Sequence, residues 1–103
     1  MDEAQQQQLQ IKADEKEMLG QYSNLAMIHH NPEEFTLNFI YIFPSVAPGV
    51  PQGKLVSSVI LNPAHAKRLW RALGENLTRY EAQFGPIREA PSPTGTPTVG
   101  IVQ

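Results

Sequence analysis

The three histidines are the side chains of this sequence best suited to bind a metal ion or move a proton. His29 and His30 are neighbours in a stretch that predicts a strand, and adjacent strand residues point to opposite faces. They therefore cannot bind one metal ion together. His65 would add a third ligand, but no cysteine and no pattern of carboxylates accompanies the histidines. We predict no metal site and no cofactor.

The hydroxyl and carboxyl groups are arranged no better for catalysis. Ser57 and Ser58 fall inside a predicted strand, whereas a hydrolase nucleophile occupies a sharp turn between a strand and a helix. Glu33 and Glu34 are adjacent at a predicted turn, where water solvates both carboxylates. No glycine-rich loop joins a strand to a helix, so no segment is shaped to hold a nucleotide phosphate. We predict no catalytic residue and no enzymatic activity.

Basic side chains gather mainly in the first half of a predicted helix. The helix dipole disfavours cations there, which indicates an anionic partner such as a phosphate, a nucleic-acid backbone or a carboxylate of another copy. The alternative is a solvated face on which Glu75 pairs with Arg71 and Arg79. We favour the solvated face, because charge runs on helices are usually solvated. A nucleic-acid interface would also need more basic residues and exposed aromatic side chains. The residues of this basic helix face are His65, Lys67, Arg68, Arg71 and Arg79.

The composition limits the classes of partner. The net charge is −2 at pH 7, with 41% hydrophobic and 17% charged residues, which gives no overall field for nucleic acid or a membrane surface. The sequence has no cysteine, which excludes disulfides and fits a reducing compartment. No apolar run approaches the roughly 20 residues of a membrane-spanning helix. The acidic start MDEAQQQQLQ is unlike a signal peptide. We expect a soluble cytoplasmic protein that binds no membrane.

Three stretches predict strands, and short turns favour their antiparallel pairing. They are QYSNLAMIHH, which ends at the turn signal Asn31-Pro32, then EFTLNFIYIF, and then KLVSSVILN. The second stretch alternates strictly, with Ile40 and Ile42 opposite the residues of the other face. Those residues are Phe35, Leu37, Phe39, Tyr41 and Phe43. Residues 44–54 are long for a hairpin loop, and we leave their role open.

Residues 62–85 predict one long amphipathic helix. Asn62 is suited to cap its start, Pro63 needs no donor at the first helical position, and Gly85 is suited to end it. The apolar residues recur at alternating spacings of four and three, which places them in one stripe. They are Ala66, Trp70, Leu73, Leu77, Tyr80 and Phe84, with Leu69 at the margin. We expect the phenylalanine face of the second strand to accept this stripe.

Together these elements predict an α+β fold, a three-stranded antiparallel β-meander followed by one long amphipathic α-helix. We expect residues 1–18 to form a flexible, acidic and glutamine-rich arm, because the five acidic residues there outnumber two lysines. Residues 19–87 form the β-β-β-α domain. Residues 88–103 form a flexible proline-rich tail with a short β-prone end.

This domain is small for a chain without disulfides or metal, and it is apolar on several faces. One helix cannot cover both faces of a sheet. Gly74 lies beside the stripe, where a missing side chain lets another backbone approach. The alternative is a helix glycine tolerated at a cost of about 1 kcal/mol. We predict a homodimer or higher oligomer. The predicted interface residues are Ile40, Ile42, Trp70, Leu73, Gly74, Leu77, Tyr80 and Phe84.

Four short motifs stand out along residues 20–87. They are Tyr22-Ser23-Asn24, Glu34-Phe35, the stretch NPAHAKR and Tyr80-Glu81. In this order they resemble a small bacterial and archaeal family, the domain of unknown function 3467. The resemblance implies a small stand-alone cytoplasmic protein and transfers no catalytic residue. It also marks four motif positions, namely Tyr22, Asn24, His65 and Lys67. The chain departs from the family at Ser57-Ser58, where members have a basic residue.

We interpret the chain as a small non-enzymatic, homo-oligomeric binding or structural protein. Its partner is a second copy of itself, and a further protein partner stays open. One alternative is a nucleic-acid-binding or anion-binding protein that uses the basic helix face. Another is a chaperone-like or assembly-forming protein that uses its C-terminal tail. In that tail the spacing of Val99 and Ile101 is similar to the anchoring tail of small heat-shock proteins, although the long helix departs from their all-β domain.

Overall fold

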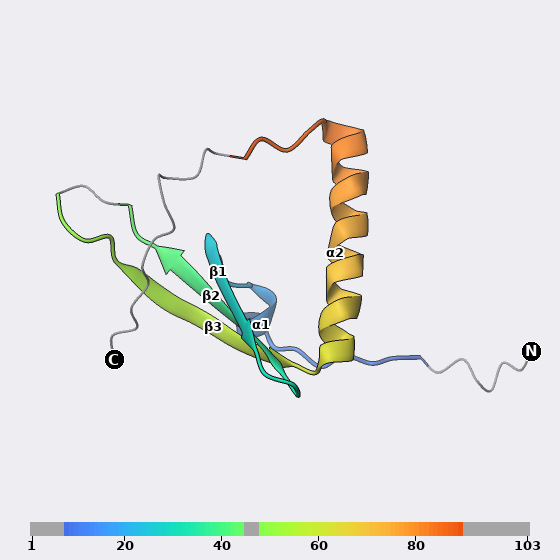
Figure 1. Cartoon of the computed structure of the whole chain (residues 1–103). Coiled ribbons are helices and arrows are strands. Elements are labelled where there is room, and N and C mark those ends of the chain that lie inside the picture. Colours follow the sequence, from blue (N-terminus) through green and yellow to red (C-terminus); the bar gives the residue numbers. More distant parts are fainter. Residues whose placement is uncertain (1–7, 45–47, 90–103) are drawn as a thin grey trace, which may run out of the picture. The chain divides into compact units, whose positions relative to one another are not determined.

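The computed structural model describes residues 8–44 and 48–89 (Figure 1). Its elements are α1 (Glu15–Met18), β1 (Leu25–His30), β2 (Phe35–Ile42), β3 (Gly53–Leu61) and α2 (Pro63–Phe84). The predicted α+β fold, a three-stranded antiparallel sheet followed by a long helix, is confirmed. The β-prone end of the predicted tail lies outside the described residues. The chain divides into two compact units after Pro63, with the sheet in the first unit and α2 from Ala64 onward in the second.

The one-turn helix α1 lies within the predicted arm and is held by local hydrogen bonds. The Glu17 backbone N–H donates to the Asp14 carboxylate at 3.2 Å, and the Asp14 N–H donates to Glu17 Oε1 at 3.1 Å. This reciprocal capping satisfies two donors that a short helix would otherwise leave unpaired. No residue of α1 is buried, so packing adds nothing to its stability.

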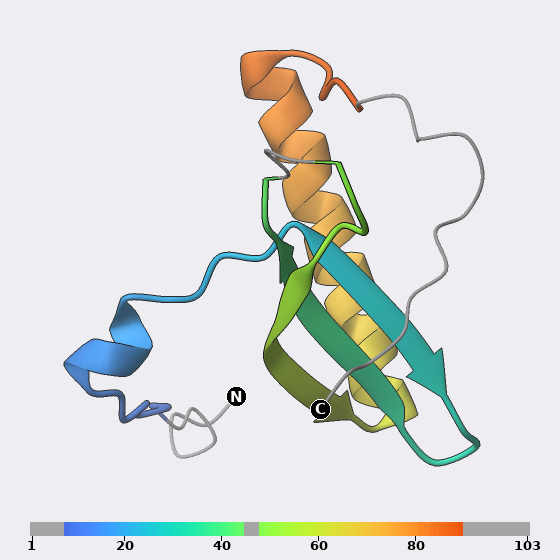
Figure 2. The ribbon, with the colours of Figure 1, turned by 90° about the vertical axis from the view of Figure 1, so that its left-hand side faces the viewer.

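The strands form one antiparallel sheet in the order β1-β2-β3 (Figure 2). The turn between β1 and β2 is organised by Asn31. Its side-chain oxygen accepts from the backbone N–H groups of Glu33, at 2.8 Å, and Glu34, at 2.9 Å. Its own N–H donates to the Glu34 carbonyl oxygen at 3.0 Å. The asparagine side chain thus does the work of a backbone turn, and Pro32 favours the bend.

The register divides the side chains of the sheet between two faces. Paired residues on neighbouring strands point to the same side, so Ile28, Leu37 and Val59 share one face. We call it the aromatic face, and from β2 it carries Phe35, Leu37, Phe39 and Tyr41. The opposite face is the mixed face, and from β2 it carries Thr36, Asn38, Ile40 and Ile42. The sheet therefore presents apolar side chains on both sides, as the alternation predicts.

The third strand departs from regular pairing at Val56. Phe39 pairs with Ser57 and Ile40 pairs with Leu55, so Val56 is the extra residue of a β-bulge. The strand begins at Gly53, one residue before the predicted start. A Cβ atom at Gly53 would lie only 3.0 Å from Ile40 Cγ2 and 3.1 Å from the Tyr41 carbonyl oxygen. Glycine therefore allows β3 to approach β2 closely at this end.

Helix α2 begins and ends as its sequence predicts. Pro63 is its first residue and Phe84 its last. Gly85 follows with φ of 94°, a conformation that glycine adopts without a Cβ clash, and its N–H donates to the Glu81 carbonyl oxygen at 2.9 Å. The Glu81 carboxylate accepts from the Ile87 N–H at 2.8 Å. Glu81 therefore ties the first residues after α2 to its last turn.

The described residues contain almost no buried core. Leu61, the last residue of β3, is their one buried side chain, with 7% of its surface exposed. The β2 residues of the aromatic face are only half-buried. Protein chains of this size normally bury roughly 60% of their unfolded surface. The described residues thus hold a regular fold without the interior that normally stabilises one.

Candidate functional site

The apolar stripe of α2 is exposed along its length. The helix is continuous, so residues three and four apart lie on the same face. Trp70 leaves 69% of its surface exposed, and no residue of α2 is buried. The other exposed members are Leu69, Leu73, Leu77, Tyr80 and Phe84. A contiguous apolar patch of this length is typical of a protein interaction surface.

The C-terminal end of this stripe is shallowly hollowed. Ile87, brought back by its bond to Glu81, joins Tyr80 and Phe84 around the hollow. The rings of Tyr80 and Phe84 lie 4.9 Å apart between centroids. Leu73 and Leu77 complete its apolar lining. The hollow is open and has no cluster of buried polar groups, so its shape suits another apolar surface better than a small polar ligand.

Gly74 lies on α2 between the turns of Trp70 and Leu77. Apart from its chain neighbours and the local helix backbone, a Cβ atom at this position would meet no atom of the described residues within 4 Å. The space around Gly74 is therefore open within the described residues. Within α2 itself no described contact requires glycine, and a missing side chain lets another backbone approach at this position.

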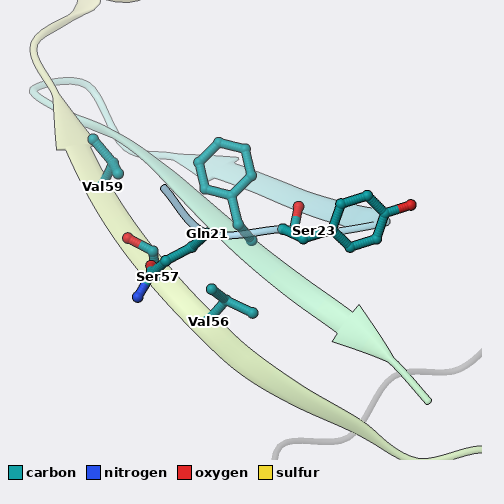
Figure 3. Close-up of a pocket in the computed structure, with 7 residues that line it drawn as sticks. Gln21, Ser23, Val56, Ser57 and Val59 are labelled. Atoms are coloured by element: carbon teal, nitrogen blue, oxygen red, sulfur yellow. The ribbon is translucent and has the colours of Figure 1, made fainter. Parts of the chain in front are cut away.

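The sheet offers a second hollow, on its aromatic face. Gln21, Tyr22 and Ser23, which precede β1, border it together with residues of β2 and β3 (Figure 3). Those further lining residues are Phe39, Val56, Ser57 and Val59. Tyr22 also packs edge-on against Tyr41, with ring centroids 6.0 Å apart. The lining is largely apolar and contains no histidine, carboxylate or other charged side chain.

The mixed face is polar at its centre and apolar toward one end. The Ser58 hydroxyl donates to the Asn38 side-chain oxygen across the two strands. Leu25 and Leu55 flank Ile40 in the register, and Ile40 is half-buried. Ile42 is exposed. Of the two isoleucines predicted at an interface, Ile40 therefore has apolar neighbours on both adjacent strands, whereas Ile42 pairs with Gly53. The serine–asparagine bond suits water or a polar partner.

The basic helix face is brought together only in part. Lys67 and Arg71 are one turn apart in α2, and Arg68 follows Lys67 directly. Arg79 lies eight residues beyond Arg71, about 12 Å along the axis, with Glu75 midway between them. All five predicted basic residues are exposed, and the first turn contains no acidic side chain. The compact part of the face is thus Lys67, Arg68 and Arg71.

His29 and His30 lie on opposite faces of the sheet. His30 stacks on Phe35, with ring centroids 5.1 Å apart, on the aromatic face. His29 pairs in register with Thr36 on the mixed face, so the two histidines diverge as alternation requires. Across residues 8–44 and 48–89, no group of three or more His, Cys, Asp or Glu side chains is placed to hold a metal ion. No helix in the same ranges combines the length and apolar character needed to cross a membrane.

Asn24 is a structural site that the alternation of the strands did not reveal. Its side-chain NH₂ donates to the Ile42 carbonyl oxygen at 3.2 Å, and its side-chain oxygen accepts from the Ile42 N–H at 2.8 Å. The amide thus imitates a strand backbone and continues the β1–β2 ladder past Leu25. Its own N–H donates to the Ile40 carbonyl oxygen at 3.0 Å. An asparagine directly before an apolar strand is the signal that could have indicated this.

The family described as "Protein of unknown function (DUF3467)" matches residues 1–89. The chain belongs to this family. No curated protein and no solved structure matches it. The resemblance inferred from the motifs is therefore confirmed, and for this DUF3467 protein the family supplies no substrate, partner or reaction.

The motif positions of this DUF3467 protein fall into two groups. Tyr22 and Asn24 hold the start of the sheet, through the Tyr41 ring and the Ile42 backbone respectively. His65 and Lys67 lie in the first turns of α2 with exposed side chains. The first pair has a structural role in the sheet. The second pair lies on the exposed surface of α2.

Proposed function

We propose that this DUF3467 protein is non-enzymatic and works by binding, and that its first partner is a second copy of itself. The observation that carries this proposal is the pair of apolar sheet faces beside a single apolar helix stripe. A helix with one stripe covers at most one sheet face. Wherever α2 lies relative to the sheet, one face receives no cover from it.

The size of the uncovered surface supports the proposal. Burying a large apolar side chain contributes roughly 1.5–3 kcal/mol, and the net stability of a domain is only about 5–15 kcal/mol. The exposed stripe of α2 alone holds six large apolar side chains, from Leu69 to Phe84. These side chains are 40–69% exposed, so burying the rest of their surface would still contribute an amount comparable to the net stability of a domain. Association between copies recovers it without a disulfide or a metal.

The first experiment is light scattering on a size-exclusion column, with absorbance followed at protein and nucleic-acid wavelengths. A dimer or larger species free of nucleic acid supports the proposal. A stable monomer across the micromolar range contradicts it. A cytoplasmic location, which we also propose, rests on the lack of cysteine.

Matched variants locate the contact on α2. Leu77→Glu places a charge in the apolar stripe and should dissociate the oligomer, because burying an unpaired carboxylate is costly. Ala82→Glu adds the same charge to the same helix, outside the stripe, and should leave the mass unchanged. Equal masses for both variants would exclude the stripe from the interface.

The basic helix face supports a second candidate, anion or nucleic-acid binding. The specific observation is that Lys67, Arg68 and Arg71 lie together where the helix has no acidic side chain. Replacing all three by glutamine should remove co-purifying nucleic acid and leave the oligomer intact if this candidate holds. An unmodified protein that carries no nucleic acid and does not bind a labelled oligonucleotide at low salt would rule it out. The chaperone-like alternative rests on a tail that lies outside the described residues.

A further inference from the structure

We propose that two copies join through the outer edge of β1, with the two β1 strands antiparallel around a two-fold axis at Ile28. This inference rests on the proposed self-association and specifies its geometry. The three strands of each copy would then form one continuous sheet in the order β3-β2-β1-β1-β2-β3. The outer edge of β1 has no strand partner within the described residues (Figure 2).

The alternation of backbone hydrogen bonds shows which residues of β1 have N–H and C=O groups that do not bond to β2. The Asn31 N–H donates to the Glu34 carbonyl oxygen, so Asn31 and Glu34 form a hydrogen-bonded pair. This pair lies two positions beyond the pair His29 and Thr36 in the same β1–β2 register. Bonding and non-bonding pairs alternate along an antiparallel ladder. Leu25, Met27 and His29 therefore bond to β2. The residues that direct their N–H and C=O groups outward are Ala26, Ile28 and His30.

The two edge strands of the sheet differ in the features that discourage a strand of another molecule from pairing with them. The edge strand β3 has a bulge at Val56 and a charged residue at Lys54, and both discourage addition of another strand. The edge strand β1 contains no bulge, no proline, no lysine and no carboxylate. Its register with β2 is regular from Leu25 to His30. An unprotected apolar edge of this kind favours pairing with another strand.

The side chains of β1 are compatible with antiparallel pairing of β1 with β1 of a second copy. An axis at Ile28 pairs Ile28 with Ile28 of the second copy, and Ala26 with His30 of the second copy. In this register each of the three outward-facing residues forms a backbone hydrogen-bonded pair with a residue of the second copy. Any other two-fold register leaves at least one of the three without such a partner inside β1. Ile28, now 61% exposed, would meet its equivalent on the aromatic face. The small Ala26 side chain would leave space for the imidazole.

A single introduced cysteine tests this axis, because the natural sequence contains none. Ile28→Cys places two thiols opposite each other with Cα atoms about 5.5 Å apart, within the roughly 4.4–6.8 Å that a disulfide spans. Ile60→Cys is the matched control, since Ile60 is 59% exposed but lies on β3, at the other edge. Each full-length variant is treated with diamide at micromolar concentration and followed on a non-reducing gel.

Rapid conversion of Ile28→Cys to a covalent dimer, at least tenfold faster than Ile60→Cys, is the expected result. Equal rates, or faster cross-linking through Ile60→Cys, would overturn the β1 axis. Mixing Ala26→Cys with His30→Cys should likewise give a mixed disulfide, whereas neither variant alone should cross-link. Cross-linking of His30→Cys with itself would contradict the register.

A charge variant distinguishes failure of this inference from failure of the proposed self-association. Ile28→Lys sets two lysines opposite each other and should weaken the dimer at least tenfold by sedimentation, while Ile60→Lys should change it less than twofold. A wild-type monomer would overturn both proposals. A wild-type dimer that survives Ile28→Lys and does not cross-link through Ile28→Cys would overturn only the β1 edge and leave the α2 stripe or a sheet face as the contact.

Discussion

Single asparagines do much of the structural work in this small sheet. Asn24 replaces a backbone pair at the start of β1, and Asn31 replaces a backbone turn at its end. Both use the side-chain amide where the main chain alone would leave donors or acceptors without partners. Such bonds matter more here than in a larger domain, because so little apolar burial is available to offset their loss.

Removing the Asn24 amide should destabilise the sheet. Asn24→Ala loses both bonds to Ile42 and should cost about 1–3 kcal/mol of unfolding free energy, since each net bond contributes roughly 0.5–1.5 kcal/mol. Urea denaturation followed by circular dichroism measures this. Ser23→Ala, at the neighbouring position, is the control and should change stability by less than about 0.5 kcal/mol. Equal losses would mean that the amide bonds contribute nothing specific.

The turn at Asn31 makes a sharper chemical prediction. Asn31→Asp keeps the accepting oxygen and should preserve most of the stability. Asn31→Ala leaves the N–H groups of Glu33 and Glu34 without their partner and should cost about 1 kcal/mol. The comparison uses denaturation of both variants at neutral pH. A loss as large in Asn31→Asp as in Asn31→Ala would contradict this role of the oxygen.

At the scale of elements, the strands and the helix could be predicted from the sequence because turn and capping residues mark the boundaries between them. Asn31-Pro32 separates β1 from β2, and Asn62-Pro63 separates β3 from α2. The alternation of β2 correctly separates Phe39 from Ile40. The bulge at Val56 could not be predicted, because the pattern of β-branched residues in β3 shows no break there. It depends on pairing with a distant strand.

The sequence predicts which side chains form the apolar stripe, but not which surface covers them. The spacing from Trp70 to Phe84 defines one stripe, which the continuous helix bears out. The predictions that these residues, Gly74 and the isoleucines of β2 meet a second copy remain predictions. Periodicity indicates which side chains need cover, whereas the identity of the covering surface depends on shape between molecules. The outer edge of β1 cannot be predicted from the hydrophobic periodicity, because an unpaired edge consists of backbone N–H and C=O groups rather than side chains.

The two glycines of the α2 region should respond differently to alanine. Gly85→Ala must adopt a φ of 94° and should lower stability by about 1 kcal/mol. Gly74→Ala has open space and a helical position, so it should raise helix stability by up to about 1 kcal/mol within one chain. If Gly74 contacts a second copy, the same change should instead weaken association several-fold. Thermal melting and sedimentation of each variant measure the two effects separately; unchanged association would remove Gly74 from the interface.

At the scale of the whole molecule, the exposed stripe and sheet faces predict stability that depends on concentration. Association that accompanies folding adds about 2.7 kcal/mol for a protomer concentration of 100 times the dissociation constant. For a domain of this size, that corresponds to a rise in Tm on the order of 10 °C. Melting curves at 1, 10 and 100 times the measured dissociation constant check this. A Tm independent of concentration would indicate a monomeric fold that is stable alone.

The near absence of a buried interior also has a consequence for the life of the protein in a cell. If a chain becomes compact only on meeting another copy, the newly synthesised chain is the species that proteases recognise. The chance of meeting a copy rises with the square of the number of unpaired chains, whereas degradation rises only in proportion. The steady-state amount should therefore increase more steeply than the rate of synthesis. Among residues 8–44 and 48–89, the one buried side chain, Leu61 at the end of β3, offers an isolated chain little protection.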